Sequence, residues 1–222
     1  MKRTFIGLLL LFFTGSAFAQ DSSSPYYGFR LGLTAHPTIG WVKPDIGKSN
    51  GVSLGFSYGL IGDFNFTQNY SFATGLSITT INGKSTEIVT QNNFDGPDTQ
   101  TELSLKYKLQ YIEVPLTLKL KTVKINDVRF YGQFGLSNGF MIGAKQDLDM
   151  TGAASTKDVN IKDDIKFYRA GLIIGAGAEF EVSGNTSITT GLTFNNGFTD
   201  LTSSKASTVK NHYLGINFGV FF

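Results

Sequence analysis

The sequence predicts an all-β protein, an eight-stranded antiparallel transmembrane β-barrel of the outer-membrane type, which follows a cleavable signal peptide. Three observations predict it. Apolar residues alternate with small or polar residues in eight segments, as they do in the strands of such barrels. The N-terminus has the parts of a secretory signal. The last segment, residues 212–222, alternates throughout and ends on Phe222, and its length suits one tilted membrane-spanning strand.

The N-terminal segment predicts export. Lys2 and Arg3 are basic, residues 5–13 are apolar, and residues 17–19 read Ala-Phe-Ala, a small-x-small cleavage site. The apolar run is too short for a spanning helix. We therefore predict a signal peptide over residues 1–19 and an outer membrane β-barrel domain over residues 20–222.

The composition excludes several classes of protein. Cleavage removes two of the 19 basic residues, which leaves 17 against 17 acidic residues and a neutral chain. Such a chain lacks the basic surplus of a nucleic-acid binder, so no nucleic-acid partner is expected. The chain has no cysteine, which excludes a disulfide framework and thiolate metal sites.

The first three strands are expected over residues 27–41, 51–66 and 70–82. Apolar side chains occupy alternate positions, and glycine, serine, threonine or a charged residue fills the positions between. A period of two places the apolar set on one face of a strand. We expect that face toward lipid and the small or polar face toward the lumen.

The fourth strand, expected over residues 103–121, changes phase. Its apolar residues are odd-numbered as far as Tyr111 and even-numbered from Ile112. One extra residue at this point, a β-bulge, would restore a single apolar face. Pro115 supports disturbed pairing there, because proline has no N–H to donate to a sheet.

Four more strands complete the predicted barrel, over residues 128–142, 167–180, 186–198 and 212–222. The connections alternate in length. The short ones are residues 67–69, 122–127 and 181–185, and the long polar ones are residues 42–50, 83–102, 143–165 and 199–209. Outer-membrane barrels have short periplasmic turns and long external loops, so both termini are expected on the periplasmic side.

A soluble eight-stranded barrel of the lipocalin type has the same alternation with its apolar face turned inward. Three observations favour the membrane: one face is almost wholly apolar, the chain ends on Phe222, and aromatic residues stand at strand ends. The aromatic residues at strand ends are Tyr27, Trp41, Phe66, Tyr168, Phe180 and Phe198. Aromatic girdles at both interfaces are typical of membrane barrels.

Residues 110–121, Gln-Tyr-Ile-Glu-Val-Pro-Leu-Thr-Leu-Lys-Leu-Lys, resemble the Tyr-x-Glu-x-Pro-Leu strand of the PorT-like outer membrane β-barrel family of Bacteroidota. Residues 29–33, 72–78 and 175–180 resemble other strands of that family. The resemblance covers essentially the whole mature chain. It implies a small outer-membrane barrel without a catalytic motif. The family's namesake is associated with the type IX secretion apparatus, and most members have no assigned role.

Charged residues on the inward positions are the candidate functional residues. They are Arg30, Asp63, Glu113, Lys119, Arg129, Arg169 and Glu179. Eight strands enclose a lumen that side chains nearly fill, and an unpaired buried charge is costly. We interpret these residues as a cluster of mutually paired charges in the lumen. The alternative is a narrow polar path for small solutes or protons.

The sequence predicts no catalytic residue, cofactor or metal site. His36 and His212 lie on the first and last strands, but parity turns His36 inward and His212 outward, so they do not share a site. No set of nucleophile, base and orienting group is visible. Five acidic residues gather in the third long connection, Asp147, Asp149, Asp158, Asp163 and Asp164, but their spacing matches no known calcium loop.

The sequence therefore predicts a monomeric structural or interaction protein and not an enzyme. The expected partners are outer-membrane lipid, the barrel-insertion machinery, which would read the C-terminal strand ending at Phe222, and a protein that contacts the long loops. A narrow porin-like channel is the alternative. An outer-membrane lipid-modifying enzyme is a third hypothesis.

Overall fold

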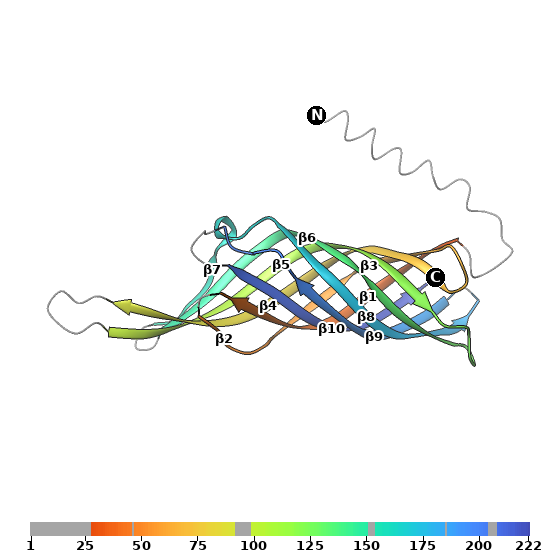
Figure 1. Ribbon diagram of the computed structural model, residues 1–222, viewed down its shortest axis with the longest axis horizontal. Coiled ribbons are helices and arrows are strands. Elements are labelled where there is room, and N and C mark those ends of the chain that lie inside the picture. The colour runs from red at the N-terminus through yellow and green to blue at the C-terminus, as the bar shows by residue number, and fades with distance from the viewer. Residues whose placement is uncertain (1–27, 46, 92–98, 151–153, 185, 204–207) are drawn as a thin grey trace, which may run out of the picture.

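Eight long antiparallel strands form a closed ring in the part of the chain that the structure describes (Figure 1). This computed structural model describes residues 28–45, 47–91, 99–150, 154–184, 186–203 and 208–222. The long strands are β1 (Gly28–Pro44), β3 (Ser53–Asn65), β4 (Tyr70–Gln91), β5 (Thr99–Lys121), β6 (Val128–Met150), β8 (Tyr168–Ser183), β9 (Thr186–Gly197) and β10 (Val209–Phe221). Each pairs with the next, and β10 pairs with β1 from Gly32 to Pro44. This ring confirms the predicted fold class.

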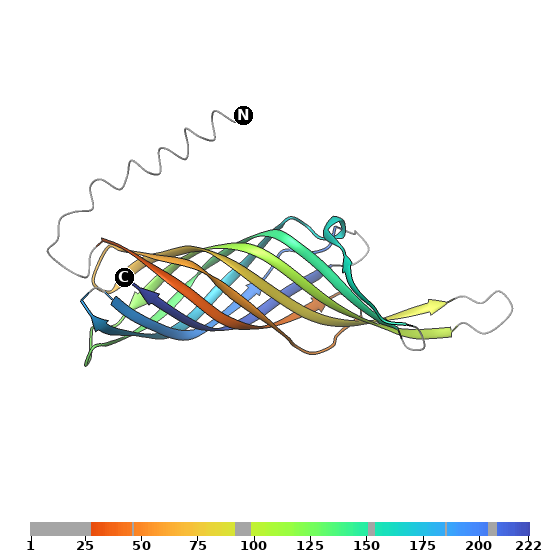
Figure 2. The same cartoon turned by 180° about the vertical axis from the view of Figure 1, so that it is seen from behind.

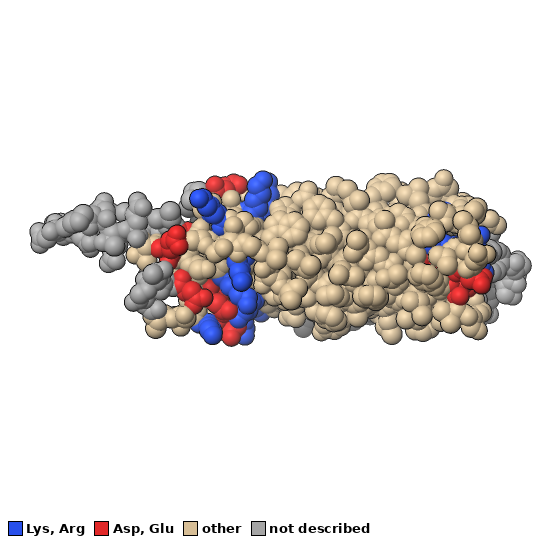
Figure 3. Space-filling view, turned by 90° about the horizontal axis from the view of Figure 1, so that it is seen from below, with Lys and Arg blue, Asp and Glu red and all other residues tan. Residues whose placement is uncertain are grey.

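Apolar side chains on the outside of the ring form a broad belt. All eight long strands contribute to it; Leu54 is 72% exposed and Phe134 is 50% exposed. In Figure 3 this belt is free of charged residues, which gather at the two ends of the barrel. An exposed apolar surface of this extent is unfavourable in water and suits the hydrocarbon of a bilayer. No helix among the described residues is long and apolar enough to cross a membrane.

The two ends of the barrel differ. At the turn end, β3–β4, β5–β6 and β8–β9 are joined by short connections, and β1 begins and β10 ends there (Figure 1 and Figure 2). In the β5–β6 connection, Asn126 and Asp127 have φ of 46° and 64°, and Ile125 bridges Val128 across them. Two residues of positive φ match the twist of a hairpin. The other end, called the loop end below, carries the longer connections.

The connection predicted over residues 83–102 is for the most part a hairpin. Beyond an interruption opposite Pro115, β4 and β5 pair without a break from Ser77 and Glu113 to Gln91 and Thr99, and this hairpin projects beyond the rest of the loop end (Figure 1). Residues 92–98 of this predicted connection lie outside the described residues. The predicted strand ended at residue 82, where the apolar alternation ends, but β4 continues to Gln91. Threonine, valine and isoleucine are common in this extension, and they favour a β-strand even where neither face of the strand contacts lipid.

The connection predicted over residues 143–165 also contains regular structure. β6 continues to Met150, β7 (Thr156–Asn160) pairs with it, and a 3₁₀ turn covers Lys162–Asp164. The short strand β2 (Lys48–Ser49) pairs with β4 at the same end. The loop end is therefore more ordered than the polar sequence indicates.

The bulge expected in β5 is wrong as placed. Leu109 and Tyr111 are buried in the lumen, and Lys119 is buried with the same odd-numbered parity, so β5 never changes the face it turns inward. The register shift at this level belongs to β6: Gln110 pairs with Gly143 and Tyr111 with Met141, which leaves one residue of β6 unmatched. The phase change in β5 instead marks the end of the lipid belt. Apolar residues face lipid within the belt, and beyond it they face inward, away from water.

The inward apolar residues at the loop end form a buried core, the apolar cap. Its members are Val42, Ile81, Leu105, Tyr107, Leu109, Tyr111, Ala144, Ile161, Ile165, Leu201, Val209 and Tyr213. They come from β1, β4, β5, β6 and β10 and from the connections that fold over them. The loop end of the barrel is thus filled with apolar side chains.

Candidate functional site in the barrel lumen

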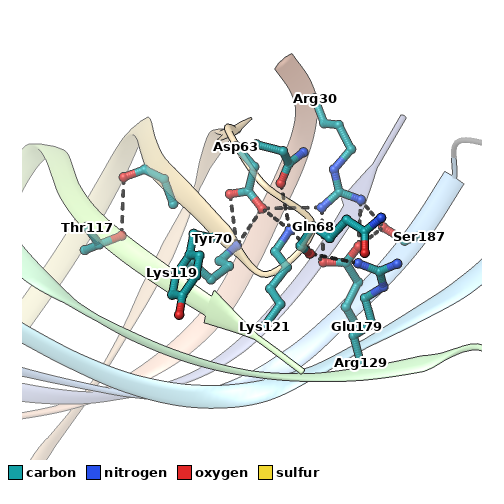
Figure 4. A network of polar contacts seen from close by, with 12 residues as sticks. Arg30, Asp63, Gln68, Tyr70, Thr117, Lys119, Lys121, Arg129, Glu179 and Ser187 are labelled. Atoms are coloured by element: carbon teal, nitrogen blue, oxygen red, sulfur yellow. Dashed lines mark hydrogen bonds and ion pairs between the residues drawn. The ribbon is translucent and has the colours of Figure 1, made fainter. Parts of the chain in front are cut away.

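Five charged residues meet inside the turn end of the barrel and form the turn-end cluster (Figure 4). Arg30 Nη1 donates to Glu179 Oε1 at 2.6 Å. Lys119 Nζ donates to both carboxylate oxygens of Asp63 at 2.9 Å. Lys121 Nζ lies 3.2 Å from Asp63 Oδ2 and 3.5 Å from Glu179 Oε2. The two carboxylates are therefore shared among three cations.

The strand register explains this meeting. Arg30 and Asp63 are direct partners on β1 and β3, and β8 supplies Glu179. Aromatic faces cover the surplus positive charge: the Arg30 guanidinium carbon lies 4.7 Å from the ring centre of Phe221, and Lys119 Nζ lies 5.1 Å from that of Tyr131. A cation over an aromatic face is attracted by the ring quadrupole. The cluster thus compensates three positive charges without a third carboxylate.

A second polar layer, the central network, lies between the turn-end cluster and the apolar cap. It is made of Glu113, Ser137, Arg169, Asn195, Asn211 and Tyr213. Arg169 has no solvent exposure. Its Nη1 lies 3.2 Å from Glu113 Oε1, its Nη2 donates to Asn195 Oδ1 at 2.8 Å, and its Nε donates to Asn211. Tyr213 donates to Glu113 Oε2 at 2.9 Å. Burial of this charge is tolerated because its donors are occupied.

A cavity of about 120 Å³ separates the two polar layers. Asp63 and Lys119 of the turn-end cluster line it, as do Glu113 and Tyr213 of the central network. His36 lines it from β1. A cavity of this size, with charged and polar groups in its lining, has room for several water molecules. The lumen is therefore closed in layers and retains a small polar space between them.

The structure brings most of the predicted lumen residues together. Arg30, Asp63 and Glu179 meet in the turn-end cluster, and Glu113 and Arg169 meet in the central network. Arg129 is the partner of Glu179 in register, and its Nη1 donates to the backbone oxygen of Gln68 in the β3–β4 turn at 3.2 Å. Arg129 therefore lies at the rim of the turn end.

Sequence reasoning missed Lys121 and the amides of the central network. Lys121 shares the odd-numbered parity of Lys119 on β5, so the alternation alone was enough to place it inside. Asn195 and Asn211 also have inward parity, but alternation does not show that they converge on Arg169. That convergence depends on how β9 and β10 align with β8.

The two histidines do not share a site. His36 faces the cavity, whereas the ring centre of His212 lies 5.8 Å from that of Trp41, which stacks on the exposed ring of Phe194. This is the arrangement that parity predicts.

Two of the acidic residues in the third long connection, Asp147 and Asp158, form ion pairs. Lys108 Nζ lies 2.8 Å from Asp147 and 3.1 Å from Asp158. The hydrogen bond from Lys108, aided by one from the backbone N–H of Asp158, holds the pKa of Asp147 below its ordinary value of 3.8. Among the described residues, no three histidine or acidic side chains are grouped to hold a metal ion.

A protein family described as "Outer membrane protein beta-barrel domain" matches residues 18–203. No curated protein matches the chain. Three solved structures illustrate its similarity to known proteins. Neisserial surface protein A is 16% identical, with a TM-score of 0.45, over 86% of this chain and 95% of that one. Ail, the attachment invasion locus protein of Yersinia pestis, is 16% identical, with a TM-score of 0.35, over 87% and 99%. The outer membrane protein OprG from Pseudomonas aeruginosa is 12% identical, with a TM-score of 0.40, over 89% and 97%.

Proposed function

Because the chain belongs to the outer membrane protein beta-barrel domain family, whose place is the outer membrane of Gram-negative bacteria, we propose that it is a structural or interaction protein. In this proposal the barrel is monomeric, conducts no solute and presents its loop end to a partner protein. Membership of the PorT-like group within this broader family stays a prediction.

One observation carries the proposal: three layers close the lumen in succession. They are the turn-end cluster, the central network and the apolar cap. A hydrated ion that crosses the cap must displace buried side chains such as Leu109 and Tyr111, neither of which has any solvent exposure. An ion without hydration or a partner is strongly disfavoured in such surroundings. A closed lumen favours a scaffold over a channel.

The second support is the β4–β5 hairpin, which stands on this closed scaffold. Its paired strands hold it away from the membrane belt. Binding residues are commonly found on segments that a rigid framework positions. We infer that the partner contacts this hairpin.

Planar-bilayer recording of the purified, folded protein tests the closed lumen. We expect no steady conductance from the unmodified chain. A variant with a smaller cap, Leu109→Ala combined with Tyr111→Ala, tests whether the cap is the barrier, and Gln110→Ala on the outer face of the same strand is its control. Steady conductance from the unmodified protein contradicts the proposal.

Site-specific photo-crosslinking in intact cells tests the partner surface. A photoreactive residue at Glu102, which is exposed on the hairpin, is compared with one at Val123, which is exposed at the turn end. We expect a discrete protein crosslink from position 102 and none from position 123. The reverse pattern places the partner at the periplasmic rim, and no crosslink from either position removes the interaction role.

The cavity between the polar layers favours the second candidate, a narrow porin-like channel, because it already provides polar space within the lumen. This function requires the apolar cap to move, and the same bilayer recording distinguishes the channel from the closed scaffold.

We also infer that the chain is not an enzyme, since its two histidines lie on opposite faces of the barrel wall. Turnover of an envelope lipid that is lost on His36→Ala would overturn this inference.

A further inference from the structure

Two lysines face each other at the seam that closes the barrel. Lys43 of β1 and Lys210 of β10 are direct partners in register. The preceding pair, Val42 and Asn211, is buried in the lumen, so Lys43 and Lys210 point outward by strand alternation. Like charges directly opposite each other destabilise an antiparallel pair. An anion bound next to both lysines would offset this repulsion.

A comparable lysine pair shows how the protein compensates such charges elsewhere. Lys108 of β5 and Lys145 of β6 are also direct partners. Here Asp147 and Asp158 accept from Lys108, and Asp158 lies 4.0 Å from Lys145. Neither Lys43 nor Lys210 has an acidic partner within this distance among the residues that the structure describes. Among the described residues, the seam pair therefore has no compensating carboxylate.

The seam pair lies at the border of the lipid belt. The next outward pair toward the turn end is Trp41 with His212, and Ile39 with Leu214 follows it. Trp41 stacks on Phe194 with 6.0 Å between ring centres. Tryptophan and other aromatic residues mark the interface between hydrocarbon and headgroups. Figure 3 shows basic side chains gathered in a band at the loop-end border of the uncharged belt. Lys43 and Lys210 are thus placed at headgroup level.

We propose that Lys43 and Lys210 together bind a phosphate group on the headgroup of an outer-leaflet glycolipid, with Trp41 packed against the same lipid. A phosphate between the two ammonium groups turns their repulsion into two charge-assisted hydrogen bonds. The proposal uses only the outward-facing loop end and is independent of whether the lumen conducts.

The loop end offers a matched control. Lys84 of β4 and Lys106 of β5 are direct partners and also point outward. Two polar pairs, Thr80 with Gln110 and Asn82 with Lys108, separate them from the nearest outward apolar pair. Asp147 of β6 stands directly opposite Lys106 in register, so this pair, unlike the seam pair, has a carboxylate beside it. Lys84→Gln with Lys106→Gln removes the same charge as Lys43→Gln with Lys210→Gln.

Native mass spectrometry of the full chain in a neutral detergent provides the test. The probes are diphosphorylated lipid A, the same lipid with both phosphates removed, and inorganic phosphate. We expect the unmodified protein to prefer the phosphorylated lipid by about thirtyfold, which is in line with two lysines near a charged lipid surface. The Lys43→Gln, Lys210→Gln variant is expected to lose that preference, and the Lys84→Gln, Lys106→Gln variant to keep it within about twofold.

Three results overturn the proposal. The first is an unchanged preference after Lys43→Gln and Lys210→Gln. The second is an equal loss in the Lys84, Lys106 variant, which indicates attraction by overall charge. The third is equal competition by inorganic phosphate, which indicates a free anion.

A stability measurement keeps the test decisive if lipid retention is poor. Without phosphorylated lipid, Lys43→Gln alone is expected to raise the unfolding temperature, because it removes the repulsion. With the lipid present, the same change is expected to lower that temperature relative to the unmodified protein. The absence of this reversal contradicts the proposal.

Discussion

Arg169 shows how a single residue constrains the interior of a narrow barrel. Its side chain has no solvent exposure, and its guanidinium reaches carboxylate and amide oxygens from β5, β9 and β10. A charge buried in this way is tolerated only while its partners stay in place. Arg169 therefore links the positions of four strands.

Replacement of Glu113 by glutamine tests this link. The change removes the only carboxylate that pairs with Arg169 among the described residues and leaves the guanidinium charged and buried. We expect the free energy of unfolding to fall by about 3 kcal/mol, at the lower end for a broken buried ion pair. Urea unfolding of the protein folded in lipid vesicles measures it.

The turn end provides the control for that experiment. Asp127 forms an exposed ion pair with Lys124 in the β5–β6 turn, and its φ of 64° is one that asparagine also adopts readily. Asp127→Asn is expected to leave the unfolding curve almost unchanged, because exposed pairs contribute little. If Glu113→Gln is as mild as this control, the central network does not stabilise the barrel.

The Lys108–Asp147 pair predicts a local effect of pH outside the membrane. Its hydrogen bond keeps the pKa of Asp147 below 3.8, so the pairing contributes fully above that pH and is lost as the pH falls through the depressed pKa. The amide N–H of Asp158 donates to the same carboxylate. We expect this amide to be protected from hydrogen exchange near neutral pH and to lose protection as Asp147 is protonated, once the intrinsic exchange rate is taken into account. In Asp147→Asn, protection that still depends on pH in this way contradicts the assignment.

Among the elements, β5 shows both what the sequence predicts and where prediction stops. The eight long strands were predictable because the lipid belt imposes an alternation that few other structures need. The same rule failed beyond the belt, where Leu109 and Tyr111 turn inward to the apolar cap. A change of surroundings along one continuous strand resembles a change of register when only the sequence is seen.

For the polar layers of the lumen, the sequence predicts which side of the wall a residue faces but not which residues contact each other. Alternation places a charged residue inside or outside, and Arg30 and Glu179, both on inward positions, lie in contact with each other. It does not show which inward residues meet across the lumen. Arg30 reaches Glu179 from β1 to β8 because the closed ring is narrow, and this follows from closure and not from either strand alone.

Two substitutions on the outer face of β5 test where the lipid belt ends. Leu118 lies in the belt and is exposed, whereas Gln110 points outward beyond the last apolar pair of the strand. We expect Leu118→Arg to lower the free energy of unfolding by about 2 to 4 kcal/mol and Gln110→Arg by about 1 kcal/mol or less, because the cost of a cation decreases from the bilayer midplane to the interface. Unfolding in vesicles measures both. Equal costs at the two positions contradict the boundary near Tyr111.

At the scale of the whole molecule, the closing strand β10 connects the wall with the interior. It pairs with both β1 and β9, and its last residues point to opposite sides of the wall. Phe221 is buried against Arg30 and Lys119 of the turn-end cluster, while Phe222 is exposed outside. Closure of the ring and completion of the turn-end cluster therefore depend on the same strand. The predicted contact of Phe222 with the insertion machinery is compatible with its exposure.

The two ends of the barrel predict its orientation in the membrane, with the β4–β5 hairpin outside the cell and the short turns in the periplasm. The chain contains no cysteine, so a single introduced thiol has no background. We expect Glu102→Cys, on the hairpin, to react with a membrane-impermeant maleimide on intact cells. Val123→Cys, in the β5–β6 turn, is expected to react only after the outer membrane is opened. Both side chains are exposed, so a difference in labelling reports the side of the membrane and not burial. Labelling of position 123 but not of position 102 on intact cells reverses the orientation. It also moves the seam lysines to the inner leaflet, where the glycolipid proposed for them is absent.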